Sequence, residues 1–146
     1  MHTYLQPLAR ALLALIFILS GLGKLAAFSA TLQLMSTVGF PAPALFLFGA
    51  VVLEVGGGCA VLVGYKTRWA AVALIMFLIP ATFVFHVASL GDQAQGQQQM
   101  VEVLKNLAII GGLLRLVTDG AGAYSLDAAW AKESATTGAT GTLVRS

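Results

Sequence analysis

Long apolar stretches separated by short polar ones dominate the hydropathy pattern of this 146-residue chain. A membrane-spanning helix needs about 20 mainly apolar residues to cross about 30 Å of hydrocarbon. Four stretches meet that requirement, the last being shorter and more polar at its start: residues 7–28, 44–64, 69–90 and 101–118. Their apolar and polar positions do not alternate, so strands are not expected. The pattern predicts an all-α protein, a transmembrane four-helix bundle that occupies residues 1–118.

Polar or helix-breaking segments connect the predicted spans. Residues 29–43 end in Gly39-Phe40-Pro41-Ala42-Pro43, which breaks a helix because proline lacks an amide donor. Residues 65–68 form only a short turn, and residues 93–99 form a Gln-rich loop. These breaks separate the apolar runs into distinct helices.

The remaining residues, 119–146, read as a cytoplasmic tail rich in Gly, Ala, Ser and Thr. Its first part contains Tyr124, Leu126 and Trp130, side chains that favour the boundary between membrane and water. The last dozen residues have the composition of a disordered segment. We therefore expect a tail that is interfacial at first and then disordered.

Composition supports a membrane protein and excludes several other classes. The chain is 58% hydrophobic and 10% charged, whereas ordinary soluble domains are about 45–50% apolar and about 25% charged. The net charge of +2 is too small for a surface that binds nucleic acid. The single cysteine, Cys59, excludes a disulfide within the chain. The lipid bilayer is the partner that this composition demands.

Lysine and arginine placement predicts the orientation. An even number of spans puts both termini on one side, and the side richer in basic residues is cytoplasmic. That side collects Arg10, Lys66, Arg68, Arg115, Lys132 and Arg145. The opposite side has only Lys24 and Lys105, both arguably within helices. We therefore expect cytoplasmic termini, and we expect Arg10 and Arg115 to reach the lipid headgroups by snorkelling.

Ionisable residues inside the spans are the candidate chemistry, because an embedded charge needs a partner, water or a cavity. Glu54 lies ten residues into the second span, about 15 Å deep at a rise of 1.5 Å per residue. Four further polar side chains fall in the same outer half of the bundle: Lys24, His86, Lys105 and Asn106. We expect these five residues to meet in one pocket.

Two interpretations of Glu54 stay open. It either pairs with Lys24 or Lys105 for structural reasons alone, or it carries a proton. Glu102 is expected to pair with Lys105 one helical turn away. With His86 and Asn106 nearby, the pocket is suited to a quinone head group, whose two carbonyls accept hydrogen bonds. No metal site is expected, because the ligands are too few.

An ordered set of short motifs runs from residue 8 to residue 127. They are Arg10, Phe17-Ile18-Leu19-Ser20-Gly21 with Lys24, Gly39-Phe40-Pro41, Glu54-Val55-Gly56-Gly57-Gly58 with Gly64 and Arg68, Lys105-Asn106-Leu107, Gly111-Gly112, Gly120-Ala121-Gly122 and Tyr124-Ser125-Leu126-Asp127. In this order they resemble the DoxX family of small four-helix bacterial membrane proteins. Ala123 departs from the family pattern, which commonly has a basic residue there.

The resemblance implies a protein of the bacterial cytoplasmic membrane. Related proteins are associated with thiosulfate:quinone oxidoreductase or terminal quinol oxidase subunits and with thiol or quinone stress. The implied role is a redox-linked, quinone-associated subunit without a covalently bound cofactor. Since no residue here carries electrons, a redox protein partner with flavin, haem or iron–sulfur would be needed. Whether the chain is itself an enzyme is left open.

Two other functions remain as alternatives. A non-enzymatic scaffold would dock soluble partners through residues 65–68 and the tail. A small-solute permease would use Glu54 as a proton-coupled site, and four helices are so few that it would require a homo-oligomer.

Overall fold

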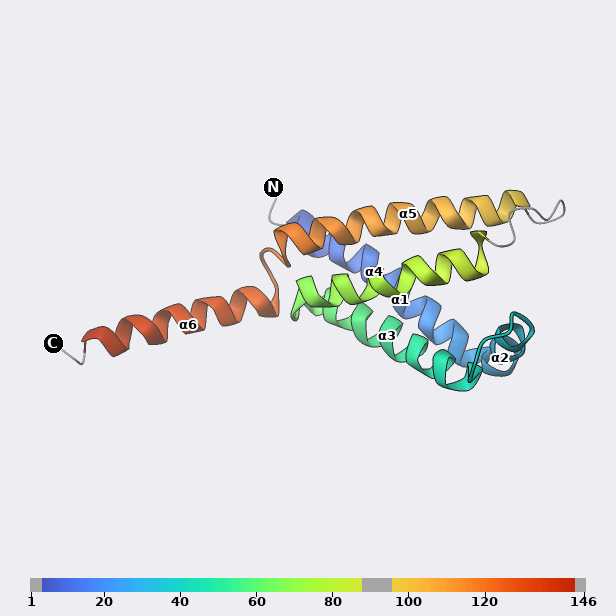
Figure 1. The fold of residues 1–146 in the computed structure, drawn as a ribbon. Coiled ribbons are helices and arrows are strands. Elements are labelled where there is room, and N and C mark those ends of the chain that lie inside the picture. Colours follow the sequence, from blue (N-terminus) through green and yellow to red (C-terminus); the bar gives the residue numbers. More distant parts are fainter. Residues whose placement is uncertain (1–3, 88–95, 144–146) are drawn as a thin grey trace.

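The fold is entirely helical over the residues that the structure, a computed structural model, describes (Figure 1). These are residues 4–87 and 96–143, with side chains described up to residue 136. The helices are α1 (Leu5–Ala26), α2 (Phe28–Thr37), α3 (Pro43–Val63), α4 (Thr67–Phe85), α5 (Gly96–Asp119) and α6 (Leu126–Leu143). The expectation of an all-α protein is confirmed.

Three of these helices are long and apolar enough to cross a membrane: α1, α3 and α4. The fourth predicted span lies within α5, which is 24 residues long but is not among them. Its apolar face is diluted by four charged side chains: Glu102, Lys105, Arg115 and Asp119. Three candidate spans are therefore found in the described chain, and the fourth is not confirmed.

The helix ends differ from the expected spans by a few residues. The run expected over residues 69–90 is helical to Phe85, and residues 88–90 lie outside the described part of the chain. The loop expected over residues 93–99 is already helical from Gly96. Glutamine has a good helix propensity, so the polar Gln97–Gln99 run continues α5 instead of interrupting it.

The connection between the first two spans contains a helix that the hydropathy pattern did not predict. This helix, α2, is only ten residues long, and its Met35 packs with Leu47 and Val51 of α3. Gly39, at a φ of +79°, then turns the chain back toward α3. Because α2 is short and is stabilised by packing on α3, its sequence contains no long apolar run from which it could be predicted.

The tail contains the last helix of the described chain. Helix α6 spans Leu126–Leu143 and extends away from the other helices (Figure 1). Alanine, the best helix former, recurs in its first half at residues 128, 129, 131 and 135. The interfacial and then disordered character expected of the tail stays a prediction.

Four long helices share one apolar core. Helix α1 packs along α3, α4 packs along α5, and α3 also packs against α4. The buried core residues come from all four: Ala14, Phe17, Val61, Ala71, Leu74, Leu78, Leu113 and Leu116. Two glycines let α1 approach α3 closely, because a Cβ on Gly21 would lie 2.7 Å from Val55 and one on Gly58 would lie 2.9 Å from Ile18.

The segment from Gly120 to Asp127, here called the clamp segment, ties three helices together at one end of the fold. Arg10 of α1 is buried and donates hydrogen bonds to the carbonyl oxygens of Ala121 and Tyr124. The expectation that Arg10 snorkels to lipid headgroups is therefore wrong. Its guanidinium satisfies backbone acceptors that burial would otherwise leave without donors.

Asp127 attaches the clamp segment to the start of α4. Its carboxylate accepts hydrogen bonds from the backbone N–H groups of Lys66, at 2.7 Å, and Thr67, at 3.0 Å. Burial raises the pKa of Asp127, but the hydrogen bonds from Thr67 and Lys66 and the charge of Arg10 outweigh it and lower the pKa below its ordinary value. Asp127 therefore caps α4 as an anion.

Candidate functional site

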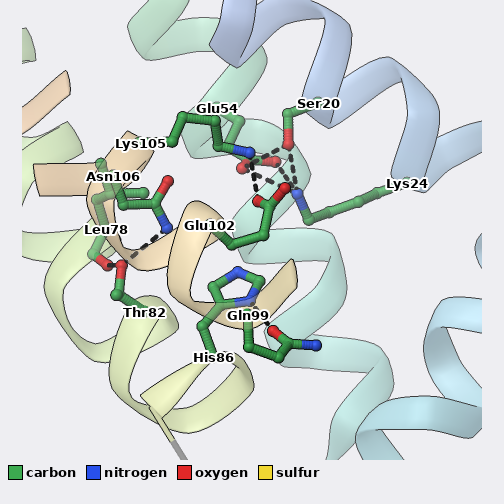
Figure 2. Close-up of polar contacts among 10 residues, drawn as sticks. All are labelled: Ser20, Lys24, Glu54, Leu78, Thr82, His86, Gln99, Glu102, Lys105 and Asn106. Carbon is green, nitrogen blue, oxygen red and sulfur yellow. Dashed lines mark hydrogen bonds and ion pairs between the residues drawn. The ribbon is translucent and has the colours of Figure 1, made fainter. Parts of the chain in front are cut away.

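All five side chains predicted to meet do line one cavity of about 160 Å³ (Figure 2). Lys24 comes from α1, Glu54 from α3, His86 from the end of α4, and Lys105 and Asn106 from α5. The cavity lies where α4 ends and α5 begins, at the end opposite the clamp segment. The structure thus brings together residues that are up to 82 positions apart, while their roles in binding stay a prediction.

The α1–α3 side of the cavity is built on an ion pair. The Lys24 ammonium lies 2.8 and 2.9 Å from the two carboxylate oxygens of Glu54. The Ser20 hydroxyl donates to Glu54 at 3.1 Å and accepts from Lys24 at 2.7 Å. The Glu54 side chain is 5% exposed and that of Lys24 is 30% exposed. A nearly buried carboxylate is therefore paired with a cation that still reaches the cavity.

Local sequence explains why Lys24, and not Lys105, pairs with Glu54. Ser20 and Lys24 are four residues apart, so they lie on one face of α1. Gly21 lies beside them, and a Cβ there would be only 3.2 Å from the Cβ of Glu54. The missing side chain lets α1 bring the Lys24 stem against the carboxylate.

The α5 side of the cavity has an ion pair of its own. Lys105 contacts Glu102 one turn earlier, as the spacing predicts. Both are half-exposed, at 43% and 33% of their side-chain surfaces. The two ion pairs are held separately on α5 and on the α1–α3 pair, and both line the same cavity.

Neutral polar groups join α4 to α5 at the cavity wall. The buried Asn106 amide donates to the Thr82 hydroxyl at 2.9 Å, and that hydroxyl donates to the Leu78 carbonyl at 2.7 Å. His86 Nδ1 lies 2.7 Å from Gln99 Oε1. Asn106 has a second amide hydrogen and His86 a second ring nitrogen, so each retains capacity toward a ligand.

One polar lining residue, Ser20, and two residues that contact the lining, Thr82 and Gln99, were not identified from sequence as part of the site. Ser20 bridges the ion pair, Thr82 orients Asn106, and Gln99 orients His86. The i, i+4 spacing to Lys24 could have identified Ser20. Gln99 fell in the segment read as a loop. Within the described residues, no group of three or more His, Cys, Asp or Glu side chains could hold a metal ion.

An apolar groove of about 490 Å³ adjoins the polar cavity. Its lining residues come mainly from α3 and α4, with two from the α2 region: Met35, Phe40, Phe46, Ala50, Leu53, Ala73, Met76, Phe77, Pro80, Ala81 and Val84. Phe77 and Ala81 line both the groove and the polar cavity. A small hydrogen-bonding chamber therefore borders a larger hydrocarbon surface.

Comparisons with known proteins agree with the sequence motifs. A sequence model of the DoxX family matches residues 5–87. "Inner membrane protein YqjF" of Escherichia coli (strain K12) is 39% identical over 119 residues, covering 82% of this chain and 86% of the relative. "Inner membrane protein YphA" of the same organism is 36% identical over 121 residues, covering 82% and 86%. The search of solved structures found no match.

Proposed function

This chain belongs to the DoxX family of membrane proteins, and from that premise we propose a redox-linked, quinone-binding subunit of the bacterial inner membrane. Two similar proteins are named inner membrane proteins, which supports the location. Three helices of the described chain are long and apolar enough to span the membrane, in agreement with an integral membrane protein. The quinone role rests on the cavity and its neighbouring groove.

In this proposal α5 is the fourth membrane crossing and completes a four-helix bundle. Its 24 residues extend about 36 Å, enough to cross the hydrocarbon. Two of its charges, Glu102 and Lys105, pair with each other at the cavity, and the other two, Arg115 and Asp119, pair at 2.7 Å near its end. Pairing lowers the free-energy cost of placing these four charged side chains in the membrane, so α5 can cross it despite them.

The same proposal places both termini in the cytoplasm. Basic side chains gather at the end of the fold where α4 begins and α5 ends: Arg10, Lys66, Arg68 and Arg115. The cytoplasmic side of a membrane protein is normally the one richer in lysine and arginine. Lys132 follows in α6, and Arg145 lies outside the described residues. The polar cavity then lies in the outer half of the membrane.

The observation that carries the quinone proposal is the polar cavity bordered by the apolar groove through Phe77 and Ala81. A cavity of about 150 Å³ can hold a benzene ring, so 160 Å³ suits a single-ring head group. A quinone head places two carbonyl acceptors there, and its isoprenoid tail fits the groove. Lys105, Asn106 and His86 are the donors in reach of such a ring.

Reduction of the bound quinone would need two electrons and two protons. The electrons come from a partner with flavin, haem or iron–sulfur, because this chain has no group that carries them. Glu54 is the candidate to pass protons toward the ring, with Lys24 stabilising its anionic form. The quinol would leave along the groove into the bilayer.

Binding of a photoreactive short-chain benzoquinone to the full chain in lipid nanodiscs tests this proposal. We expect saturable labelling of peptides from α3 to α5. Asn106→Leu and His86→Phe should each weaken binding about tenfold, since one hydrogen bond is worth about 1.4 kcal/mol. Gln33→Leu, at an exposed position of α2, is the matched control and should change nothing. Labelling that does not saturate, or that all variants retain equally, overturns the proposal.

A docking scaffold is the second candidate, and α6 is the observation that favours it. This helix extends away from the helices of the core (Figure 1), so it is accessible to a soluble partner. If the scaffold is the function, truncation after residue 130, which keeps Asp127 on the start of α4, abolishes activity in cells whereas Glu54→Gln preserves it. The quinone proposal requires the opposite pattern.

A further inference from the structure

A second pocket, at the end of the fold opposite the polar cavity, has a different chemistry. Its volume is about 600 Å³, and it lies where the α3–α4 turn, the end of α5 and the start of α6 meet. Lys66, Arg68 and Trp69 line one wall, and Gly120 and Ser125 line another. The quinone proposal does not use this pocket.

The acidic residues of this pocket are already satisfied. The Asp127 carboxylate accepts the backbone N–H groups of Lys66 and Thr67. The Asp119 carboxylate pairs with Arg115 at 2.7 Å. Each acid is therefore balanced by hydrogen bonds or by a cation outside the pocket lining, and neither one neutralises the two basic side chains of the wall.

Those two side chains, Lys66 and Arg68, are both exposed. Neither takes part in an ion pair within the part of the chain that the structure describes. Arg68 is nevertheless positioned, because it donates to the Thr118 carbonyl at 3.2 Å and its Nε lies 3.4 Å from where a Cβ of Gly120 would be. An oriented guanidinium beside an ammonium is a favourable arrangement for a phosphate.

The pocket also lies at the level of the membrane boundary. Trp69 is 76% exposed, and the ring of Tyr65 packs edge-on against Trp130 at 5.4 Å. Tryptophan and tyrosine favour the headgroup region. From this level an exposed apolar stripe runs along α4 at helical spacing: Trp69, Val72, Met76, Ile79 and Phe83. A ligand here can place its phosphate on the two cations and an acyl chain along the stripe.

We propose that the pocket formed by Lys66, Arg68 and Trp69 binds the phosphate of an anionic phospholipid headgroup. The apolar stripe that continues from the pocket favours a lipid over a soluble phosphate, which has no apolar part to place there. This inference does not depend on the quinone proposal, because it concerns the opposite end of the helices.

Fluorescence quenching by brominated lipids in nanodiscs tests it on the full chain. The chain has two tryptophans, so Trp130→Phe leaves Trp69 as the single reporter. We expect brominated phosphatidylglycerol to quench Trp69 more than brominated phosphatidylcholine at equal mole fraction, with the excess shrinking as salt rises. Lys66→Gln and Arg68→Gln should each lower the anionic-lipid preference about fivefold.

Lys132→Gln is the matched control, because it removes the same charge from an exposed position of α6 outside the pocket. Equal quenching by the two lipids overturns the proposal, as does an equal loss in Lys132→Gln and Arg68→Gln. Inorganic phosphate is compared with chloride at the same ionic strength. Phosphate should remove more of the excess than chloride does, because the two cations recognise the phosphate group. If phosphate changes Trp69 fluorescence while the two brominated lipids quench equally, the site takes free phosphate, and the lipid assignment is overturned. If Arg68→Gln fails to fold, Lys66→Gln and the salt dependence decide between these outcomes.

Discussion

Removing Lys24 from the Lys24–Glu54 ion pair should destabilise the fold much more than removing the charge of Glu54. Lys24→Met leaves a carboxylate whose side chain is 5% exposed, with Ser20 as its remaining donor. Removing one partner of a buried ion pair costs about 3–5 kcal/mol, because the other charge stays buried without compensation. Glu54→Gln instead leaves an ammonium that is 30% exposed on a flexible stem. That cation can reach water, so we expect a cost of about 1 kcal/mol.

Reversible unfolding in mixed detergent micelles, followed by circular dichroism, measures these free energies. The double variant Lys24→Met/Glu54→Gln should recover most of the loss, since a neutral replacement leaves no unpaired buried charge. Lys105→Met is the matched control, because its pair with Glu102 is half-exposed, and it should cost less than about 1 kcal/mol. If Lys24→Met costs no more than Lys105→Met, the reasoning about burial is refuted.

Three further predictions concern the opposite end of the fold and use the same unfolding measurement. Arg10→Met should lower the free energy of unfolding by about 2–4 kcal/mol, because two carbonyl oxygens lose their donors. Arg115→Met, at a side chain that is 77% exposed, should lower it by less than about 1 kcal/mol. Equal losses would contradict the role of Arg10 in holding the clamp segment. Because the pKa of Asp127 is lowered in the folded state, its contribution is complete above the ordinary value of 3.8 and is lost as the pH falls through the lower folded value. Asp127→Asn should remove that acid-dependent loss, and an unchanged acid profile would argue against the cap. Gly64→Ala should lower the free energy of unfolding by at least about 2 kcal/mol, because φ is +72° and the new Cβ would lie 2.4 Å from the Cβ of Ser125. Gly56→Ala, where a Cβ meets open space, should be neutral or stabilising by up to about 1 kcal/mol. Similar values for the two variants would disprove the packing argument.

The sequence by itself determined the class of the protein and five of the polar residues that line its cavity. Long apolar runs and few charges are a property of composition, so they predict membrane helices without any knowledge of packing. The rise and phase of a helix are constant, so depth and face follow from residue numbers alone. That is why Lys24, Glu54, His86, Lys105 and Asn106 could be expected at one level of the bundle.

Local pattern was insufficient where stability comes from contacts between segments distant in sequence. The short helix α2 is stabilised by packing on α3. A buried Arg10 looks the same in sequence as a snorkelling one, because its acceptors lie more than 110 residues away.

Only the tertiary structure decided which cation pairs with Glu54. Two lysines were within reach by depth, and the choice of Lys24 depends on how closely α1 approaches α3 at Gly21. Helical periodicity specifies the face and the depth of a residue on its own helix. The distance between two helices is set by the side chains packed between them. The absence of a side chain at Gly21 therefore determined that Lys24 pairs with Glu54.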